Sequence, residues 1–255
     1  MERIQALHLK RANTGMTCRV NRNGTSPNVE AACWDFQHIT KGGVDQKSHP
    51  KNPGKAVIKH QLSGNRGHWA VLDGAFIILE FSGFPHYTAM QIRTHRDSQT
   101  LIQTYREENN KILQFAEKVI KGESTNAEDV TQAYYIRPVG FYYDRNGTRT
   151  EFGEAERNKR LEYCKTNALR YYELIQQGQS PEIARDILLD CRRQDFAIAG
   201  TVKALFHWLD QRSKADTQLE TRLVAQLAIE QCYELMPEFM AYYMENRYGK
   251  AITSP

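Results

Sequence analysis

The sequence lacks long hydrophobic runs, a strong excess of either charge and closely spaced cysteines. The longest apolar run, near residues 76–84, is too short to cross a bilayer, and no charged-then-apolar signal peptide opens the chain. A formal net charge of +4 over 255 residues is small for a general nucleic-acid-binding protein, which carries a basic stripe. We therefore expect neither a membrane nor a nucleic acid as a partner.

The five cysteines are odd in number, lie far apart and form no Cys-x-x-Cys pair. This pattern favours reduced thiols in a cytoplasmic protein over disulfides or a zinc site. We expect a cytoplasmic protein without a bound metal.

The hydrophobic pattern predicts few strands and many helices, which is typical of an α+β fold. A chain of this length forms one large domain or two closely joined ones. Ser26-Pro27 and Ser180-Pro181 each predict an N-cap followed by proline at the first helical position, and Gly178 is placed to end a helix. We expect strands at residues 1–10, 75–81, 134–143 and 196–199, and helices at 26–36, 55–62, from 85 through 96, 154–177, 182–189, around 205–209, 218–236 and 237–248.

Basic side chains crowd the segment Gln91-Ile92-Arg93-Thr94-His95-Arg96, and Thr104-Tyr105-Arg106 follows shortly after it. An arginine fork donates in pairs to phosphate oxygens, so the cluster points to a nucleotide or another phosphorylated small molecule. From the residues alone, a solvated basic face explains the cluster equally well.

The spacing of this cluster resembles the signature of flavin-dependent thymidylate synthases, which is Arg-His-Arg, seven residues, Ser, one residue, Arg. Thr94 and Thr104 stand here for the first arginine and the serine, and a branch of that family common in cyanobacteria also has Arg-Thr-His-Arg. Further segments resemble the family in the right order along the chain. These are residues 67–69, 135–140, 185–189, 209–220 and 247–251.

The resemblance implies a single domain over residues 1–255 with the family's fold, a small antiparallel sheet with flanking and C-terminal helices. It also implies a homotetramer that shares its sites between subunits. The implied reaction is C5 methylation of dUMP to dTMP, with FAD as cofactor and with NADPH and methylenetetrahydrofolate as co-substrates. No protein nucleophile is needed, because the cofactors carry the difficult steps.

The resemblance also assigns roles residue by residue. The residues that it assigns to the nucleotide are Gln91, Arg96, Thr104, Arg106, Arg185 and Arg212, of which Arg212 is also the catalytic residue that stabilises negative charge on the uracil ring. The residues that it assigns to the flavin are His68, His95, Thr201, Lys203 and His207, with Thr201 and Lys203 in place of the family's asparagine and arginine. Without the resemblance, His207 is a packed residue, Arg185 a surface residue, and Arg212 a partner of Asp210 or Asp216.

Several positions depart from the family pattern. Leu101 and Ile102 stand where the family has Asn-Glu, Gln99 replaces a serine, and Asp73-Gly74 replaces Glu-His. These changes leave two alternatives open. One is a divergent paralogue that methylates or hydroxymethylates UMP, CMP or dCMP, and the other is a non-catalytic nucleotide-binding homologue.

Overall fold

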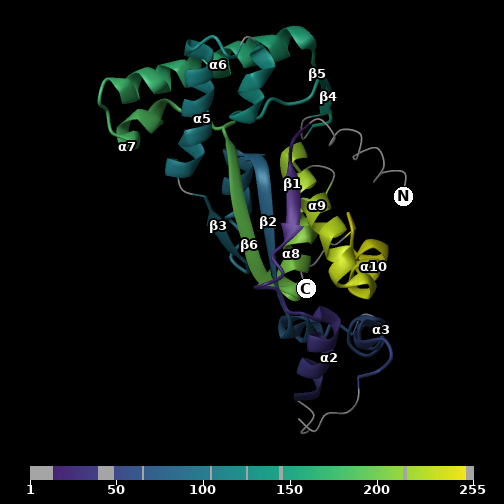
Figure 1. The fold of residues 1–255 in the computed structure, drawn as a ribbon. Coiled ribbons are helices and arrows are strands. Elements are labelled where there is room, and N and C mark those ends of the chain that lie inside the picture. Colours follow the sequence, from purple (N-terminus) through teal and green to yellow (C-terminus); the bar gives the residue numbers. More distant parts are fainter. Residues whose placement is uncertain are drawn as a thin grey trace. The chain divides into compact units, whose positions relative to one another are not determined.

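A computed structural model describes residues 14–39, 49–64, 66–103, 105–124, 126–143, 146–214 and 217–250 (Figure 1). The chain forms two compact units, each assembled from separate segments. The first unit combines residues through Met16 with Ser82–Gln91 and Ile102–Phe196, and the second combines Thr17–Phe81, Ile92–Leu101 and the chain from Ala197 onward. The mixture of helices and small sheets confirms the α+β expectation.

A four-stranded sheet has the strand order β1-β2-β6-β3. Its strands are β1 (Thr17–Val20), β2 (Phe76–Pro85), β6 (Arg193–Thr201) and β3 (Gln99–Ile102). Side chains alternate along β2, and Ile77, Leu79 and Phe81 are all buried on the same face. The two strands predicted at residues 75–81 and 196–199 are therefore present. Strand β2 begins one residue later than expected and continues to Pro85, whereas β6 extends beyond both expected ends.

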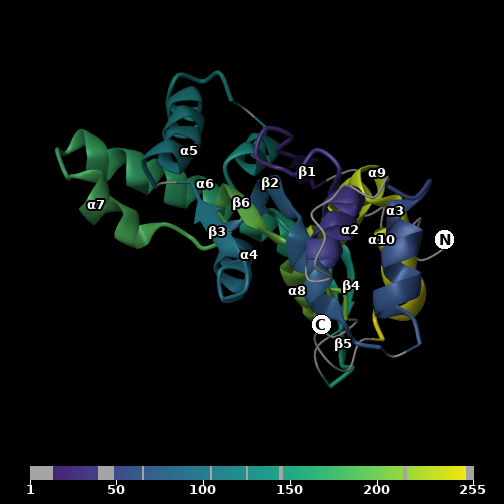
Figure 2. The same ribbon diagram turned by 90° about the horizontal axis from the view of Figure 1, so that it is seen from below.

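Helices make up more than half of the described residues of the second unit. They are α2 (Val29–Ile39), α3 (Pro53–Val57) with the π-helix η1 (Ile58–Leu62), the 3-10 helix η2 (Trp69–Gly74), α8 (Val202–Arg212), α9 (Leu219–Leu235) and α10 (Pro237–Asn246). Figure 2 shows α3 beside α10, with which it packs. The core of this unit includes the fully buried Trp208, Phe206, Phe239 and Tyr243, with Phe206 and Tyr243 in ring contact.

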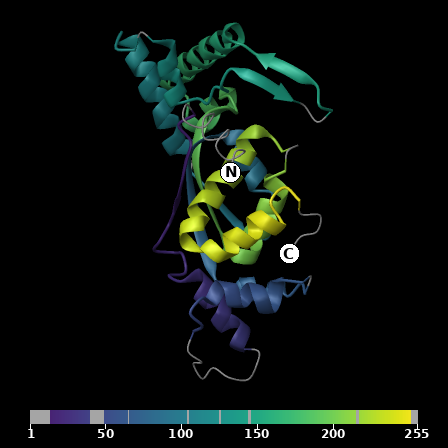
Figure 3. The same cartoon turned by 90° about the vertical axis from the view of Figure 1, so that its right-hand side faces the viewer.

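The first unit contains most of α4 (His86–Ile92), together with α5 (Tyr105–Ile120), the 3-10 helix η3 (Ala127–Gln132), α6 (Glu154–Gln176), α7 (Pro181–Ala184) and the 3-10 turn η4 (Arg185–Ile187). The strands β4 (Gly140–Tyr143) and β5 (Arg149–Phe152) form an antiparallel hairpin (Figure 3). In its register Gly140 pairs with Phe152. A buried cluster joins α5, α6 and η3, and there Cys164 Sγ lies 3.8 Å from Cys191 Sγ.

Several sequence-based boundaries are wrong for identifiable reasons. Helix α2 begins later than expected, because its first turn is capped by Asn28, whose Oδ1 accepts from the Ala31 amide at 3.1 Å, and not by Ser26. The predicted strand 134–143 is reduced to an isolated bridge between Tyr134 and Arg192, followed by irregular chain and then β4. The predicted helix 182–189 is the short pair α7 and η4.

The long helix α6 agrees closely with its prediction, and Gly178 follows it at φ +84, where glycine is favoured. The predicted strand at residues 1–10 lies outside the described residues. Within the part of the chain that is described, no helix is both long and apolar enough to span a membrane, and no cluster of three or more metal-ligating side chains occurs.

Candidate active site

The basic residues of the cluster, Arg93, His95 and Arg96, lie in a turn that follows helix α4 (His86–Ile92). Helix α4 ends at Ile92, whose carbonyl accepts from the His95 amide at 3.2 Å. Within the turn, Thr94 and Arg96 are exposed, whereas the His95 side chain turns inward and keeps only 7% of its surface exposed. The expectation that the helix carries the whole cluster is therefore wrong, and the turn separates one buried imidazole from its exposed neighbours.

Helix α8 presents the second set of candidate residues. Thr201 is its N-cap, and its Oγ1 accepts from the Ala204 amide at 3.2 Å. Lys203 and His207 are four residues apart, so they lie on the same face of the helix. Arg212 stands in the last turn, where its side chain is half-buried, and this burial lowers the pKa of its guanidinium.

Arg212 and His95 are in direct contact although 117 positions separate them. Arg212 Nε donates to His95 Nε2 at 2.7 Å, and Arg212 Nη2 reaches Thr94 Oγ1 at 3.5 Å. Burial, followed by the charges of Arg212 and His207, lowers the pKa of His95 to about 4. The imidazole is therefore neutral at neutral pH.

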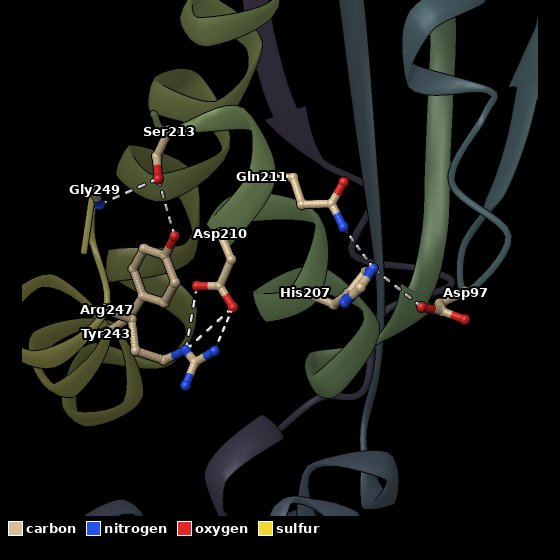
Figure 4. Close-up of polar contacts among 8 residues, drawn as sticks. All are labelled: Asp97, His207, Asp210, Gln211, Ser213, Tyr243, Arg247 and Gly249. Carbon is tan, nitrogen blue, oxygen red and sulfur yellow. Dashed lines mark hydrogen bonds and ion pairs between the residues drawn. The ribbon is translucent and has the colours of Figure 1, made fainter. Parts of the chain in front are cut away.

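His207 lies beside His95, with ring centroids 6.4 Å apart in an edge-on arrangement. Gln211 Nε2 is 3.0 Å and Asp97 Oδ2 is 3.5 Å from the same nitrogen, His207 Nε2 (Figure 4). Both partners therefore lie at the same ring nitrogen of His207.

Asp73 joins the two candidate residues at the start of α8. Thr201 Oγ1 donates to Asp73 Oδ1 at 2.8 Å, and Lys203 Nζ lies 3.6 Å from Asp73 Oδ2. All three side chains lie in the second unit. The carboxylate therefore offsets part of the positive charge of Lys203.

A small pocket, with room for about one water molecule, lies beside Thr201 at the start of α8. Its lining includes Ser98, Gly200, Thr201 and Trp208. Among the residues that the structure describes, none gives a hydrogen bond to the buried Ser98 Oγ or Trp208 Nε1. Buried polar groups of this kind are rare, and an ordered water can satisfy them.

Residues 24–238 match the model of the family Thy1, described as thymidylate synthase complementing protein. The chain belongs to this family. The resemblance to flavin-dependent thymidylate synthases is thereby confirmed.

One relative in the family is a flavin-dependent thymidylate synthase of Haloarcula marismortui, 22% identical over 244 residues, with 92% of each chain covered. Among solved structures, thymidylate synthase X from Helicobacter pylori with FAD and dUMP has a TM-score of 0.67 at 11% identity, covering 90% of this chain and 98% of that one. The UMP/dUMP methylase PolB from Streptomyces cacaoi, bound with 5-Br UMP, has a TM-score of 0.68 at 15% identity, covering 95% and 98%. These Thy1-like structures confirm the expected fold.

The second unit of this Thy1 protein brings His95, His207 and Arg212 together, and Asp73 links Thr201 to Lys203. His68 and Arg96 are exposed in the same unit. In the first unit, Gln91 is half-buried in the last turn of α4, and Arg185 is exposed in η4. Thr104 and the side chain of Arg106 lie outside the described residues.

One sequence-based alternative for Arg212 is wrong. Asp210 pairs with Arg247, whose Nη2 lies 2.5 Å from Asp210 Oδ2 (Figure 4). Residues two apart on a helix point to different sides, so Asp210 and Arg212 diverge. The other alternative, Asp216, lies outside the described residues.

Sequence reasoning missed the roles of Asp73, Asp97 and Gln211 as partners of the candidate residues. Only Gln211 carried a signal, since it is four residues after His207 on a predicted helix. Gly74, noted as a departure from the family's histidine, has a structural reason, because a Cβ at this position would lie 2.4 Å from Phe36 Cβ. The approach of α2 to η2 therefore excludes a side chain there.

Proposed function

We propose that this protein is a cytoplasmic homotetrameric enzyme that transfers a methyl group to C5 of dUMP. The carbon donor is methylenetetrahydrofolate, the reductant is NADPH and the cofactor is FAD. The two units act as one functional domain. The observation that carries the proposal is the contact between His95 and Arg212, which joins two separate family motifs within one unit.

The residues at the start of α8 are suited to FAD. The N-terminus of a helix favours anions, and Lys203 adds a positive charge near the place where a diphosphate group would bind. His95 and His207 supply imidazole rings whose centroids lie 6.4 Å apart. Thr201, Lys203, His95, His207 and the exposed His68 would therefore hold the flavin. When bound, FAD supplies the reducing equivalents for the methyl transfer.

The protein's own part in the reaction is binding and charge stabilisation. Arg96, Arg106 and Arg185 would bind the phosphate of the nucleotide through paired donors, with Gln91 and Thr104 as further polar contacts. Arg212 is half-buried, so its charge acts through a lower effective dielectric than in water. We assign to it the stabilisation of negative charge that develops on the uracil ring.

A second candidate function is methylation of a different pyrimidine nucleotide, such as UMP. Leu101 stands in β3 where the family has a polar residue, and it keeps 76% of its surface exposed. A site that loses polar partners discriminates poorly between hydroxyl groups. The fold likeness to PolB, named as a UMP/dUMP methylase, supports this candidate.

The first test is to purify the protein and record its absorption spectrum with and without added FAD. We expect flavin bands and, by light scattering, a tetramer. A protein that binds no flavin even after incubation would reject both enzymatic candidates and favour a non-catalytic nucleotide-binding role. A monomer would reject the shared-site arrangement.

A further inference from the structure

We infer that His95 is a positioning residue for Arg212, holding the guanidinium through a neutral acceptor that leaves its positive charge intact. The role of Arg212 in the chemistry rests on the proposed function. The assignment of His95 as its positioning partner rests on the contact itself.

The hydrogen bond fixes the tautomer of His95. An arginine side chain has donors only, so the bond of 2.7 Å requires a lone pair on His95 Nε2. In the neutral ring the proton then resides on Nδ1. His95 is 7% exposed, so few solvent molecules compete for Nε2.

The charges around the ring keep it neutral. Arg212 and His207 disfavour a proton on His95, whereas Asp97 favours one, and burial has a larger effect than any of them. The pKa of about 4 therefore preserves the acceptor across the physiological range.

A neutral partner differs from the usual partner of arginine. A carboxylate would orient Arg212 but would also offset its charge. The carboxylate nearest in sequence, Asp210, is instead held by Arg247 through three contacts of 2.5 to 3.2 Å. An imidazole acceptor therefore orients Arg212 while its field still acts on an anionic ligand.

A merely structural contact and a positioning contact make different predictions. If His95 only fills space, then any side chain of similar size will serve. If it positions Arg212, then the acceptor lone pair and its neutrality both matter. The two possibilities are separated by changing one property at a time.

The first experiment needs neither flavin nor substrate. Histidines are labelled with ¹⁵N, and the tautomer and pKa of His95 are followed by NMR in the wild type and in Arg212→Met. We expect an Nδ1–H tautomer that stays neutral to about pH 4 in the wild type, and a higher pKa in the variant, because a neighbouring positive charge is gone. An Nε2–H tautomer, or a pKa that does not change in the variant, would overturn the inference. Failure of the proposed function leaves this experiment unaffected.

The second experiment measures kcat and KM at saturating FAD for three variants. His95→Leu removes the acceptor, His95→Gln restores a neutral one, and His95→Glu supplies a charged one. We expect kcat to fall by roughly 30-fold or more for His95→Leu, to recover by about tenfold for His95→Gln, and to stay low for His95→Glu.

The nucleotide KM should change much less than kcat in these variants. Combining His95→Leu with Arg212→Met should cause no loss beyond that of Arg212→Met alone, because both act through one group. Equal kcat values for His95→Leu and His95→Gln, or additive losses in the double variant, would overturn the inference. Circular dichroism confirms that each variant is folded.

Discussion

Lys203 Nζ lies 3.6 Å from Asp73 Oδ2, so the cation at the first turn of α8 faces a carboxylate of its own chain. The same carboxylate accepts from Thr201 Oγ1 at 2.8 Å. An anionic cofactor group that binds at this turn must share Lys203 with Asp73. The carboxylate of Asp73 therefore opposes the binding of an anion at this end of the helix.

Asp73→Asn should strengthen FAD binding, because it removes a negative charge and frees Lys203. We expect a several-fold lower dissociation constant, the scale of an exposed ion pair worth up to about 1 kcal/mol. Quenching of flavin fluorescence measures the dissociation constant for FAD. Asp35→Asn, the same charge change at an exposed site on α2, is the matched control and should leave the affinity unchanged. Equal affinities for Asp73→Asn and the wild type would place the diphosphate elsewhere.

Arg96→Ala should weaken nucleotide binding more than it lowers turnover. Arg96 is exposed, so its removal leaves no cavity, and its assigned role is to bind phosphate. We expect a dissociation constant for dUMP about tenfold higher by calorimetry, and a similar effect for Arg106→Ala. Arg93→Ala removes another exposed arginine of the same turn that has no assigned role, and it should change binding little. Identical losses at positions 93 and 96 would indicate a general electrostatic effect.

Arg212→Ala should lower kcat by roughly 100-fold or more while the protein stays folded, the scale of losing one preorganised charge-stabilising group. Steady-state kinetics and thermal unfolding measure the two effects separately. Arg170→Ala, which removes an exposed arginine that pairs with Glu173 on α6, is the control. Normal turnover of Arg212→Ala would show that its assigned role is wrong.

Arg247→Met should destabilise the second unit. It leaves the carboxylate of Asp210 buried without its arginine, which costs about 3 kcal/mol or more. Burial raises the pKa of Asp210, and Arg247 partly opposes this rise. Without Arg247 the ionised carboxylate is less stable in the folded protein, so the loss of stability in Arg247→Met should grow as the pH rises. Chemical unfolding of the wild type and Arg247→Met, in acid and at neutral pH, measures the difference in their free energies of unfolding.

Two further variants test the account of Asp210. Asp210→Asn combined with Arg247→Met should recover part of the lost stability, since no buried charge remains. Lys250→Met, at an exposed position near the same end of the chain, should change stability little. A loss for Arg247→Met that is independent of pH would mean that Asp210 does not ionise in the folded protein.

Local signals predicted the regular parts of this fold well. The apolar spacing that sets α6 and the glycine at position 178 are properties of neighbouring residues, so the sequence reveals them directly. The start of α2 was missed because Ser26 and Asn28 are both good caps, and only the tertiary setting selects between them. The loss of most of the predicted strand 134–143 likewise reflects pairing partners that are distant in sequence.

The family pattern named the candidate residues, but it did not reveal how they contact one another. His95 meets Arg212 across 117 positions, and no local periodicity encodes such a contact. Gly74 could be noted as a departure, whereas its cause, the close approach of Phe36, requires the packed structure. Asp73 was noted only as a departure, and its contacts with Thr201 and Lys203 appear only in the fold.

The most direct test of the proposed function is to offer dUMP, UMP, dCMP and CMP separately with methylenetetrahydrofolate, NADPH and FAD, and to follow the products by mass spectrometry. The account predicts that dUMP gains a methyl group in place of hydrogen, and that this product disappears in Arg212→Ala. Because Leu101 is exposed where the family has a polar residue, we expect this protein to discriminate against UMP less strongly than an enzyme that uses dUMP alone. Methylation of UMP, CMP or dCMP, with no methylation of dUMP, would support the divergent paralogue. No product from any of the four nucleotides, with flavin bound, would contradict the proposal that this protein is a pyrimidine methyltransferase.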